Sequence, residues 1–135
     1  MVALLTTLAA SVFAGSGEEQ ASETSAAQPV YEEISSSQAA KIAKDPNVFI
    51  LDVRTPAEYA AGHITDATLL PVQDLASRIS EISQYKDTEI LVYCRSGNRS
   101  TTASQILMNA GFTNIKNLKY GLIEWAGEGL PLTTE

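Results

Sequence analysis

The 135-residue sequence contains one cysteine, Cys94, and one histidine, His63. A single cysteine can form no disulfide within the chain, and with one histidine it falls short of the ligand set of a zinc site. We therefore expect no disulfide framework, no metal site and no cofactor. Cys94 itself is expected to be either a small buried residue or a reactive thiol.

Basic residues are also scarce, because nine Lys and Arg stand against sixteen Asp and Glu, for a net charge of −7. Proteins that bind nucleic acids or anionic membranes cluster Lys and Arg to displace counterions from phosphate. The basic residues of this chain are few and scattered. The composition thus argues against a nucleic-acid partner, and the length is that of one domain.

The first fourteen residues, Met1 to Ala14, are apolar and uncharged. They end in Val12, Phe13 and Ala14, a small-x-small pattern typical of signal-peptide cleavage. We expect a cleaved signal peptide, a periplasmic or extracellular location, and no stable membrane insertion after cleavage. An uncleaved anchor is the alternative, although a helix of this length spans only about 20 Å of the roughly 30 Å hydrocarbon core. A disordered or buried apolar tail is a third interpretation.

Residues 15–30 are expected to form a disordered linker, since positions 15–29 contain no aromatic or branched aliphatic side chain. Such a segment cannot bury enough apolar surface to offset the entropy of ordering. The folded domain is therefore predicted at residues 31–135.

Short apolar runs alternate with helical patterns through this domain. Apolar runs predict strands at residues 48–51, 68–70, 89–93 and 114–118. Helical spacing or capping predicts helices at residues 35–44, 74–84, 100–110 and 122–126, and Thr55-Pro56 is expected to open a further short helix. This alternation predicts an α/β fold with a parallel sheet of four to five strands and helices on both faces.

Cys94 follows directly on the apolar run 89–93, at the point where a predicted strand leads toward a helix. In open α/β sheets, ligands bind beyond the carboxyl ends of the strands. The position therefore favours a reactive thiol over a buried structural cysteine.

The loop after Cys94 comprises Arg95, Ser96, Gly97, Asn98, Arg99 and Ser100. Gly97 and Asn98 are the residue types that best adopt positive φ, so we expect a tight turn that points backbone N–H groups at the sulfur. These amides, the helix N-terminus and the two guanidinium groups of Arg95 and Arg99 are expected to stabilise a thiolate, which is the nucleophilic form of cysteine.

Three segments in this order resemble single-domain rhodaneses, a family of sulfurtransferases. They are LDVRTPAEYAAGHITDA at residues 51–67, YCRSGNRSTTASQIL at 93–107 and GFTNIKNLKYGLIEW at 111–125. The resemblance implies that the Cys94 thiolate takes the outer sulfur of thiosulfate, releases sulfite and passes the sulfur from a persulfide to a nucleophile such as cyanide. It further implies that Arg95 and Arg99 hold a small anionic donor, and that the acceptor is a thiol or a protein.

The resemblance also implies supporting roles for other residues. Asp52, Arg54 and Glu58 are expected to tie a strand end to the neighbouring helix and to the active-site loop. His63 is expected to brace a turn away from the sulfur. Tyr120 stands where the family usually has glycine, and it is expected either to line the pocket or to cover a surface groove.

Two alternatives to a sulfurtransferase remain. Phosphatases and arsenate reductases of related folds carry a Cys-Arg loop one residue longer than Cys94 to Arg99, and Tyr93 stands where they often have histidine. The shorter loop is expected to fit one sulfur atom better than a tetrahedral oxyanion. The second alternative is a binding module without turnover, or a persulfide carrier for a protein partner.

Overall fold

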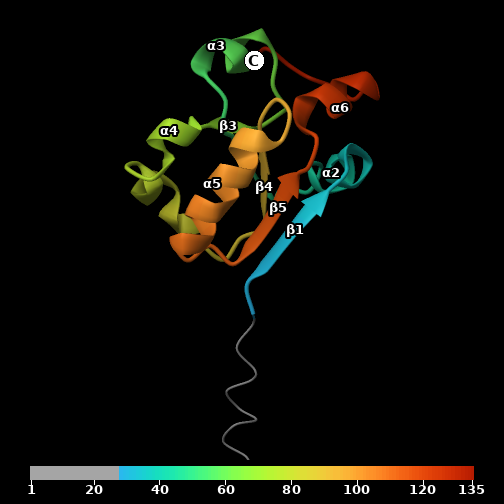
Figure 1. Ribbon diagram of the computed structural model, residues 1–135. Coiled ribbons are helices and arrows are strands. Elements are labelled where there is room, and N and C mark those ends of the chain that lie inside the picture. The colour runs from blue at the N-terminus through green and yellow to red at the C-terminus, as the bar shows by residue number, and fades with distance from the viewer. Residues whose placement is uncertain (1–27) are drawn as a thin grey trace, which may run out of the picture.

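Five parallel strands form the sheet at the centre of the protein (Figure 1), in the order β1-β5-β4-β2-β3. The computed structural model describes residues 28–135, so the predicted signal peptide and most of the predicted linker lie outside the described residues. The strands are β1 Val30–Ile34, β2 Phe49–Asp52, β3 Thr68–Leu69, β4 Ile90–Tyr93 and β5 Asn114–Leu118. The expected parallel α/β sheet is confirmed.

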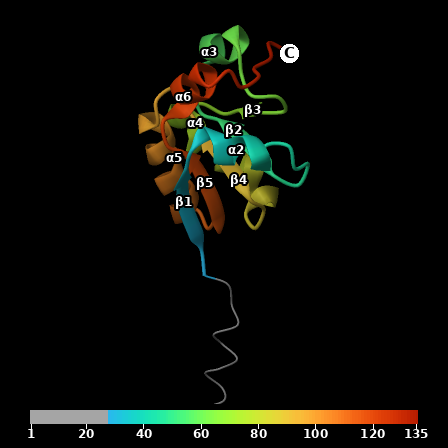
Figure 2. The same cartoon turned by 90° about the vertical axis from the view of Figure 1, so that its right-hand side faces the viewer.

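Helices cover both faces of the sheet, as expected. They are α2 Ser36–Ile42, α3 Pro56–Ala61, α4 Val72–Leu75, α5 Asn98–Asn109 and α6 Gly121–Gly127, with the 3-10 helix η1 at Ile79–Tyr85. Figure 2 shows α5 and α2 on opposite sides of the sheet. The short helix predicted from Thr55-Pro56 is α3, with Thr55 as its N-cap.

The central strand β4 explains why the core has two halves. All four of its residues are buried, and successive side chains of a strand point to opposite faces. Ile90 and Val92 pack under α4, η1 and α5, whereas Leu91 and Tyr93 pack under α2 and α6. A strand covered on both faces is continuously apolar, which is the pattern that its sequence has.

The edge strand β1 was not among the predicted strands. It pairs along its whole length with β5, from Val30 beside Asn114 to Ile34 beside Leu118. Only Ile34 is buried, and the two glutamates of the strand are exposed. An edge strand that buries one side chain carries no apolar run, so the pattern that identified the other strands is absent here.

The single helix predicted at residues 74–84 is wrong. The chain instead forms α4 and η1, with Ile82 in a non-helical conformation at φ −120°. Two serines in this segment bond backward to backbone carbonyls, Ser77 to Asp74 and Ser83 to Ser80. Such local bonds compete with regular helix formation, while the spacing still buries Leu75 and Ile82.

A buried polar cluster holds the carboxyl ends of β2 and β4 together. The Tyr93 hydroxyl donates to Oδ2 of Asp52 at 2.6 Å and accepts from the backbone N–H of Ile64 at 3.1 Å. Arg54 donates from Nε and Nη2 to the Asp52 carboxylate and from Nη2 to the carbonyl of Gly62. The cluster thus connects the two strand ends to the loop that follows α3.

Replacing Tyr93 with Phe tests this connection. The Tyr93→Phe variant leaves the Ile64 N–H unpaired and removes a donor from Asp52, so we expect the free energy of unfolding to fall by about 1–3 kcal/mol. Urea denaturation measures the change. Tyr85→Phe is the control, because that hydroxyl makes no hydrogen bond within residues 28–135, and we expect a change within about 0.5 kcal/mol. Equal stability of the two variants would contradict the assigned role.

Candidate active site

Cys94 is the first residue after β4, and its side chain is 1% exposed. The backbone N–H groups of Gly97 and Ser100 donate to its sulfur at 3.1 and 3.3 Å. The thiol lies 3.5 Å from Oγ of Ser100, to which it donates. Backbone amides from the turn before α5 and from the first turn of α5 thus point at the sulfur, at the edge of the sheet where the strands have their carboxyl ends.

Gly97 makes this arrangement sterically possible. Its φ is +104°, and a Cβ atom at this position would collide with the carbonyl oxygen of Lys119. Only glycine tolerates both conditions. Asn98, which was expected to share the positive φ, is instead the first residue of α5, so the turn depends on Gly97 alone.

The start of α6 supports the loop from the other side. The N–H groups of Leu122 and Ile123 donate to the carbonyls of Cys94 and Arg95, both at 3.0 Å. Gly121, at φ +66°, lies so close to Arg95 that a Cβ would collide with its carbonyl group. Sequence reasoning did not assign Gly121 a role, although a glycine at the start of a helix after a strand is a usable signal.

The electrostatics of the loop favour the Cys94 anion. Burial by itself raises the pKa of a thiol, because it penalises the charged form. Hydrogen bonds from the Ser100 hydroxyl and from the backbone amides of Ser100, Gly97 and Ser96 outweigh burial and lower the pKa of Cys94 below its ordinary value. The loop therefore favours the thiolate, which is the nucleophilic form of cysteine.

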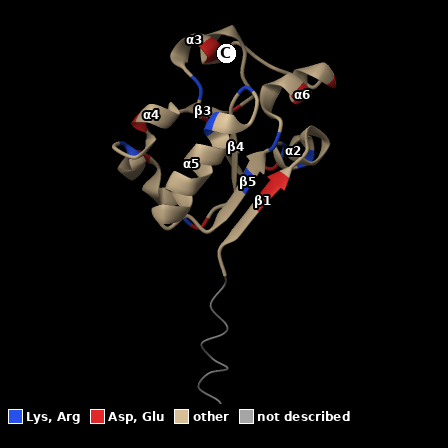
Figure 3. Cartoon of the chain, viewed as in Figure 1, with Lys and Arg blue, Asp and Glu red and all other residues tan. Residues whose placement is uncertain are grey.

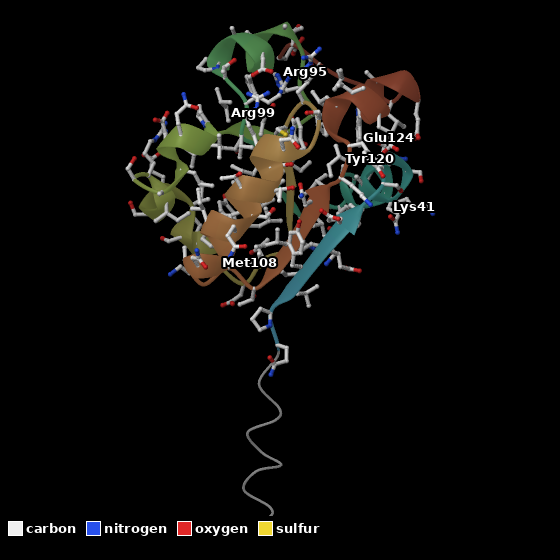
Figure 4. The ribbon with its side chains drawn as sticks, viewed as in Figure 1. Lys41, Arg95, Arg99, Met108, Tyr120 and Glu124 are labelled. Carbon is white, nitrogen blue, oxygen red and sulfur yellow. The ribbon has the colours of Figure 1, made fainter. Side chains whose placement is uncertain are left out.

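The two arginines of the loop do not contact the sulfur. Arg99 donates from Nη1 and Nη2 to the two carboxylate oxygens of Glu58, at 2.8 and 2.9 Å. Arg95 is exposed and forms no ion pair among the described residues. Figure 4 shows both side chains at the end of the sheet near α3. The expected stabilisation of the sulfur therefore comes by contact from amides and Ser100, with Arg99 acting only through its nearby charge.

Glu58 connects α3 to this loop. Its Oε1 accepts from the backbone N–H of Thr55 while Thr55 Oγ1 accepts from the Glu58 N–H, which makes a capping box. The hydrogen bonds from Arg99, helped by those from Thr55, lower the pKa of Glu58 to about 2. Figure 3 shows this arrangement of charge, with an acidic residue on α3 and basic residues at the start of α5 and in the loop before it.

His63 lies in the turn that follows α3, and its contacts stabilise that turn rather than the sulfur. It is buried, its ring stacks on Tyr59 at a centroid distance of 3.6 Å, and its Nδ1 lies 2.8 Å from the Tyr59 carbonyl. Its backbone forms a bridge with Thr133 near the C-terminus. Tyr120 is 53% exposed, with the Lys119 ammonium 5.3 Å from its ring.

The remaining loop residues, Ser96 and Asn98, are exposed at the surface of the loop. Within residues 28–135, no three His, Cys, Asp or Glu side chains converge in a way that could hold a metal ion. In the same part of the chain, every helix is too short or too polar to cross a membrane.

The hydroxyl of Ser100 can be tested against that of Ser96. Ser100→Ala removes a hydrogen bond to the sulfur, so we expect the pKa of Cys94 to rise by about one unit and alkylation near neutral pH to slow about tenfold. Ser96→Ala keeps the backbone amide and removes an exposed hydroxyl, so its alkylation rate should match the wild type. Identical rate profiles for the two variants would contradict the assigned hydrogen bonds.

The Glu58 carboxylate gives a pH-dependent contribution to stability. Its folded pKa of about 2 lies below the ordinary 4.5, so the contribution is complete above pH 4.5 and is lost as the pH falls toward 2. Glu58→Gln keeps the cap but loses the charge. Because the pair is partly exposed, we expect a loss of about 0.5–1 kcal/mol at pH 7. Urea unfolding should show this difference vanish near pH 2, and a constant difference from pH 7 to 2 would contradict the account.

Comparison with known proteins agrees with this geometry. A family model described as a rhodanese-like domain matches residues 35–128. A sulfurtransferase of Allochromatium vinosum is 44% identical over 98 residues, which cover 73% of this chain and 90% of that protein. The chloroplastic thiosulfate sulfurtransferase 16 of Arabidopsis thaliana is 35% identical over 91 residues, 60% of this chain and 76% of that protein.

A solved structure shares the fold as well. The crystal structure of a rhodanese-related protein from Thermoplasma volcanium superposes with a TM-score of 0.70 and 28% sequence identity, covering 78% of this chain and all of that one. The family match spans all of the helices described above and every strand except the edge strand β1. From its sequence, its sheet and its strand-end cysteine loop, this chain belongs to the rhodanese-like domain family of sulfurtransferases.

Proposed function

We propose that this protein moves a sulfur atom from thiosulfate, or a similar small anionic donor, to a nucleophilic acceptor through a persulfide on Cys94. The observation that carries the proposal is the convergence of backbone amides and the Ser100 hydroxyl on a single buried sulfur. Sulfurtransferase relatives support sulfur transfer in general, and the relative whose name includes thiosulfate supports this donor.

In the first step, the Cys94 thiolate attacks the outer sulfur of thiosulfate. A bond forms between the two sulfurs, the sulfur–sulfur bond of thiosulfate breaks, and sulfite leaves with the electron pair. When Cys94 reacts as the thiolate, no proton moves in this step and no general base is needed. Arg95 forms no ion pair within residues 28–135, and it is proposed to attract the anionic donor.

In the second step, an acceptor such as cyanide or a thiolate attacks the outer sulfur of the Cys94 persulfide. The new bond forms as the persulfide bond breaks, and the Cys94 thiolate is regenerated as the leaving group. The amides that donate to the Cys94 sulfur are proposed to stabilise the thiolate that leaves in this step.

The geometry of the loop argues against phosphate as the substrate. Gly97 and Ser100 direct their amides to the sulfur itself, at 3.1 and 3.3 Å. Arg99, which a phosphate would need as a bidentate ligand, already makes both hydrogen bonds to Glu58. The short loop and the pairing of Arg99 with Glu58 thus favour sulfur transfer over phosphoryl transfer.

The remaining predicted residues are assigned supporting roles in this proposal. Asp52 and Arg54 brace the strand end through their buried pair, and Glu58 positions Arg99. His63 braces the turn against the C-terminal segment. Export to the periplasm or the cell exterior remains a proposal that rests on the apolar sequence of Met1 to Ala14.

Intact mass spectrometry tests the proposal. After incubation with thiosulfate, the wild-type protein should gain the mass of one sulfur atom, and cyanide should remove it as thiocyanate appears. Cys94→Ser should do neither, while Ser96→Ala should behave as the wild type. A wild-type protein that is folded and alkylated at Cys94, but gains no sulfur from thiosulfate, would contradict the proposed donor; no sulfur from any sulfane donor would favour a binding module.

A further inference from the structure

A chain of hydrogen-bonded polar side chains, in which Asn117 is buried, Tyr31 half-buried and Thr101 exposed, runs from the edge of the sheet to the active-site loop. Asn117, on β5, is fully buried, and its Nδ2 donates to the Tyr31 hydroxyl and to Oγ1 of Thr101, both at 3.1 Å. Thr101, in the first turn of α5, donates from Oγ1 to the carbonyl of Gly97 at 2.8 Å. None of these three side chains contacts the sulfur, and sequence reasoning identified none of them.

The direction of each hydrogen bond follows from counting protons. The Thr101 hydroxyl carries one proton. Because the Asn117 amide donates to Oγ1, that proton is free to point at the Gly97 carbonyl. The Oδ1 atom of Asn117 has no hydrogen-bond partner within residues 28–135, and an unpaired buried oxygen costs free energy. Asn117 therefore contributes to this chain through the two hydrogen bonds that its Nδ2 donates to Tyr31 and Thr101.

The Gly97 carbonyl also receives the Ser100 hydroxyl, which has two possible partners. Ser100 Oγ lies 3.2 Å from the Gly97 carbonyl and 3.5 Å from the Cys94 sulfur. With Cys94 as a thiol, the sulfur donates to Ser100, and Ser100 donates to Gly97. With Cys94 as a thiolate, the sulfur has no proton to give, and the Gly97 carbonyl and the sulfur compete for the single proton of Ser100.

When Ser100 turns to the sulfur, the Gly97 carbonyl loses a donor. It keeps the hydroxyl of Thr101 at 2.8 Å and the backbone N–H of Thr101 at 3.1 Å. A carbonyl that is already satisfied competes less strongly for the Ser100 proton. Thr101 thus lowers the free-energy cost of turning the Ser100 hydroxyl from the Gly97 carbonyl to the sulfur.

We propose that Thr101, aligned by Asn117, is a positioning residue that leaves the Ser100 hydroxyl free to donate to the ionised sulfur of Cys94. It acts through Gly97 and Ser100 and touches no reacting atom. The inference rests on the proposed function in one respect, namely that Cys94 reacts as an anion.

Substitution at Thr101 changes none of the charges around the sulfur. Six charged side chains lie on the loop or beside it, and a seventh is on α6: they are Arg95 and Arg99 of the loop, Asp52 at the end of β2 and Arg54 after it, Glu58 of α3, Lys119 before α6 and Glu124 in α6. Since every one of these remains in place, a change in the titration of Cys94 reports the hydroxyl of Thr101.

The experiment follows the alkylation of Cys94 by neutral iodoacetamide across pH in the full chain. Thr101→Val has nearly the same shape but no hydroxyl, and we expect its midpoint to rise by about half a unit to one unit. Its rate well below the midpoint should fall about three- to tenfold, with the high-pH plateau unchanged. Thr101→Ser keeps the hydroxyl and should restore the wild-type midpoint.

Thr102→Val is the matched control, because Thr102 is exposed on the same turn of α5 and its side chain makes no hydrogen bond with the described residues. Circular dichroism checks the fold of each variant, and Thr101→Ala replaces Thr101→Val if that variant is unstable. A Thr101→Val midpoint equal to those of the wild type and Thr102→Val would overturn the proposal. Sulfur loading of the wild type decides the proposed function separately, whatever the Thr101 variants do.

Discussion

The proposed chemistry depends on one electrostatic constraint, which is that a sulfur anion must be stable at a position almost closed to water. Burial of Cys94 opposes ionisation, and within the described part of the chain the groups that hydrogen-bond to the sulfur and offset this are the loop amides and the Ser100 hydroxyl. Amides fixed by the backbone need no reorganisation as charge arrives or leaves. The rest of the fold can therefore be understood as the support that keeps this loop in one conformation.

That support comes from segments far apart in the sequence. The turn before α6 lies against Gly97, and the first amides of α6 bind the carbonyls of Cys94 and Arg95. On another side, Glu58 of α3 binds Arg99, while β5 reaches the loop through Asn117 and Thr101. The parallel sheet brings these segments together because the carboxyl ends of its strands share one edge.

Much of this could be predicted from the sequence where local patterns carry the information. The apolar run before Cys94 predicted a buried strand that ends at the thiol, and the glycine three residues later predicted the turn. The strand β1 was not predicted, because it buries only one side chain and so has no apolar run. The helix predicted at 74–84 is two shorter helices, because its serines bond to nearby carbonyls. The partner of Arg99 lies 41 residues away, and Asn117 is 16 residues from Thr101. Spacing carries no signal for such contacts, so only the resemblance to a family implied that Glu58 supports the loop.

The most direct test of the account is an ultraviolet titration of the Cys94 thiolate in the wild-type protein, with Cys94→Ser as the blank. The amide-lined loop predicts a midpoint clearly below the ordinary thiol value of about 8.5. A midpoint at or above that value would mean that burial outweighs the hydrogen bonds, and it would contradict the claim that this loop holds an anionic nucleophile.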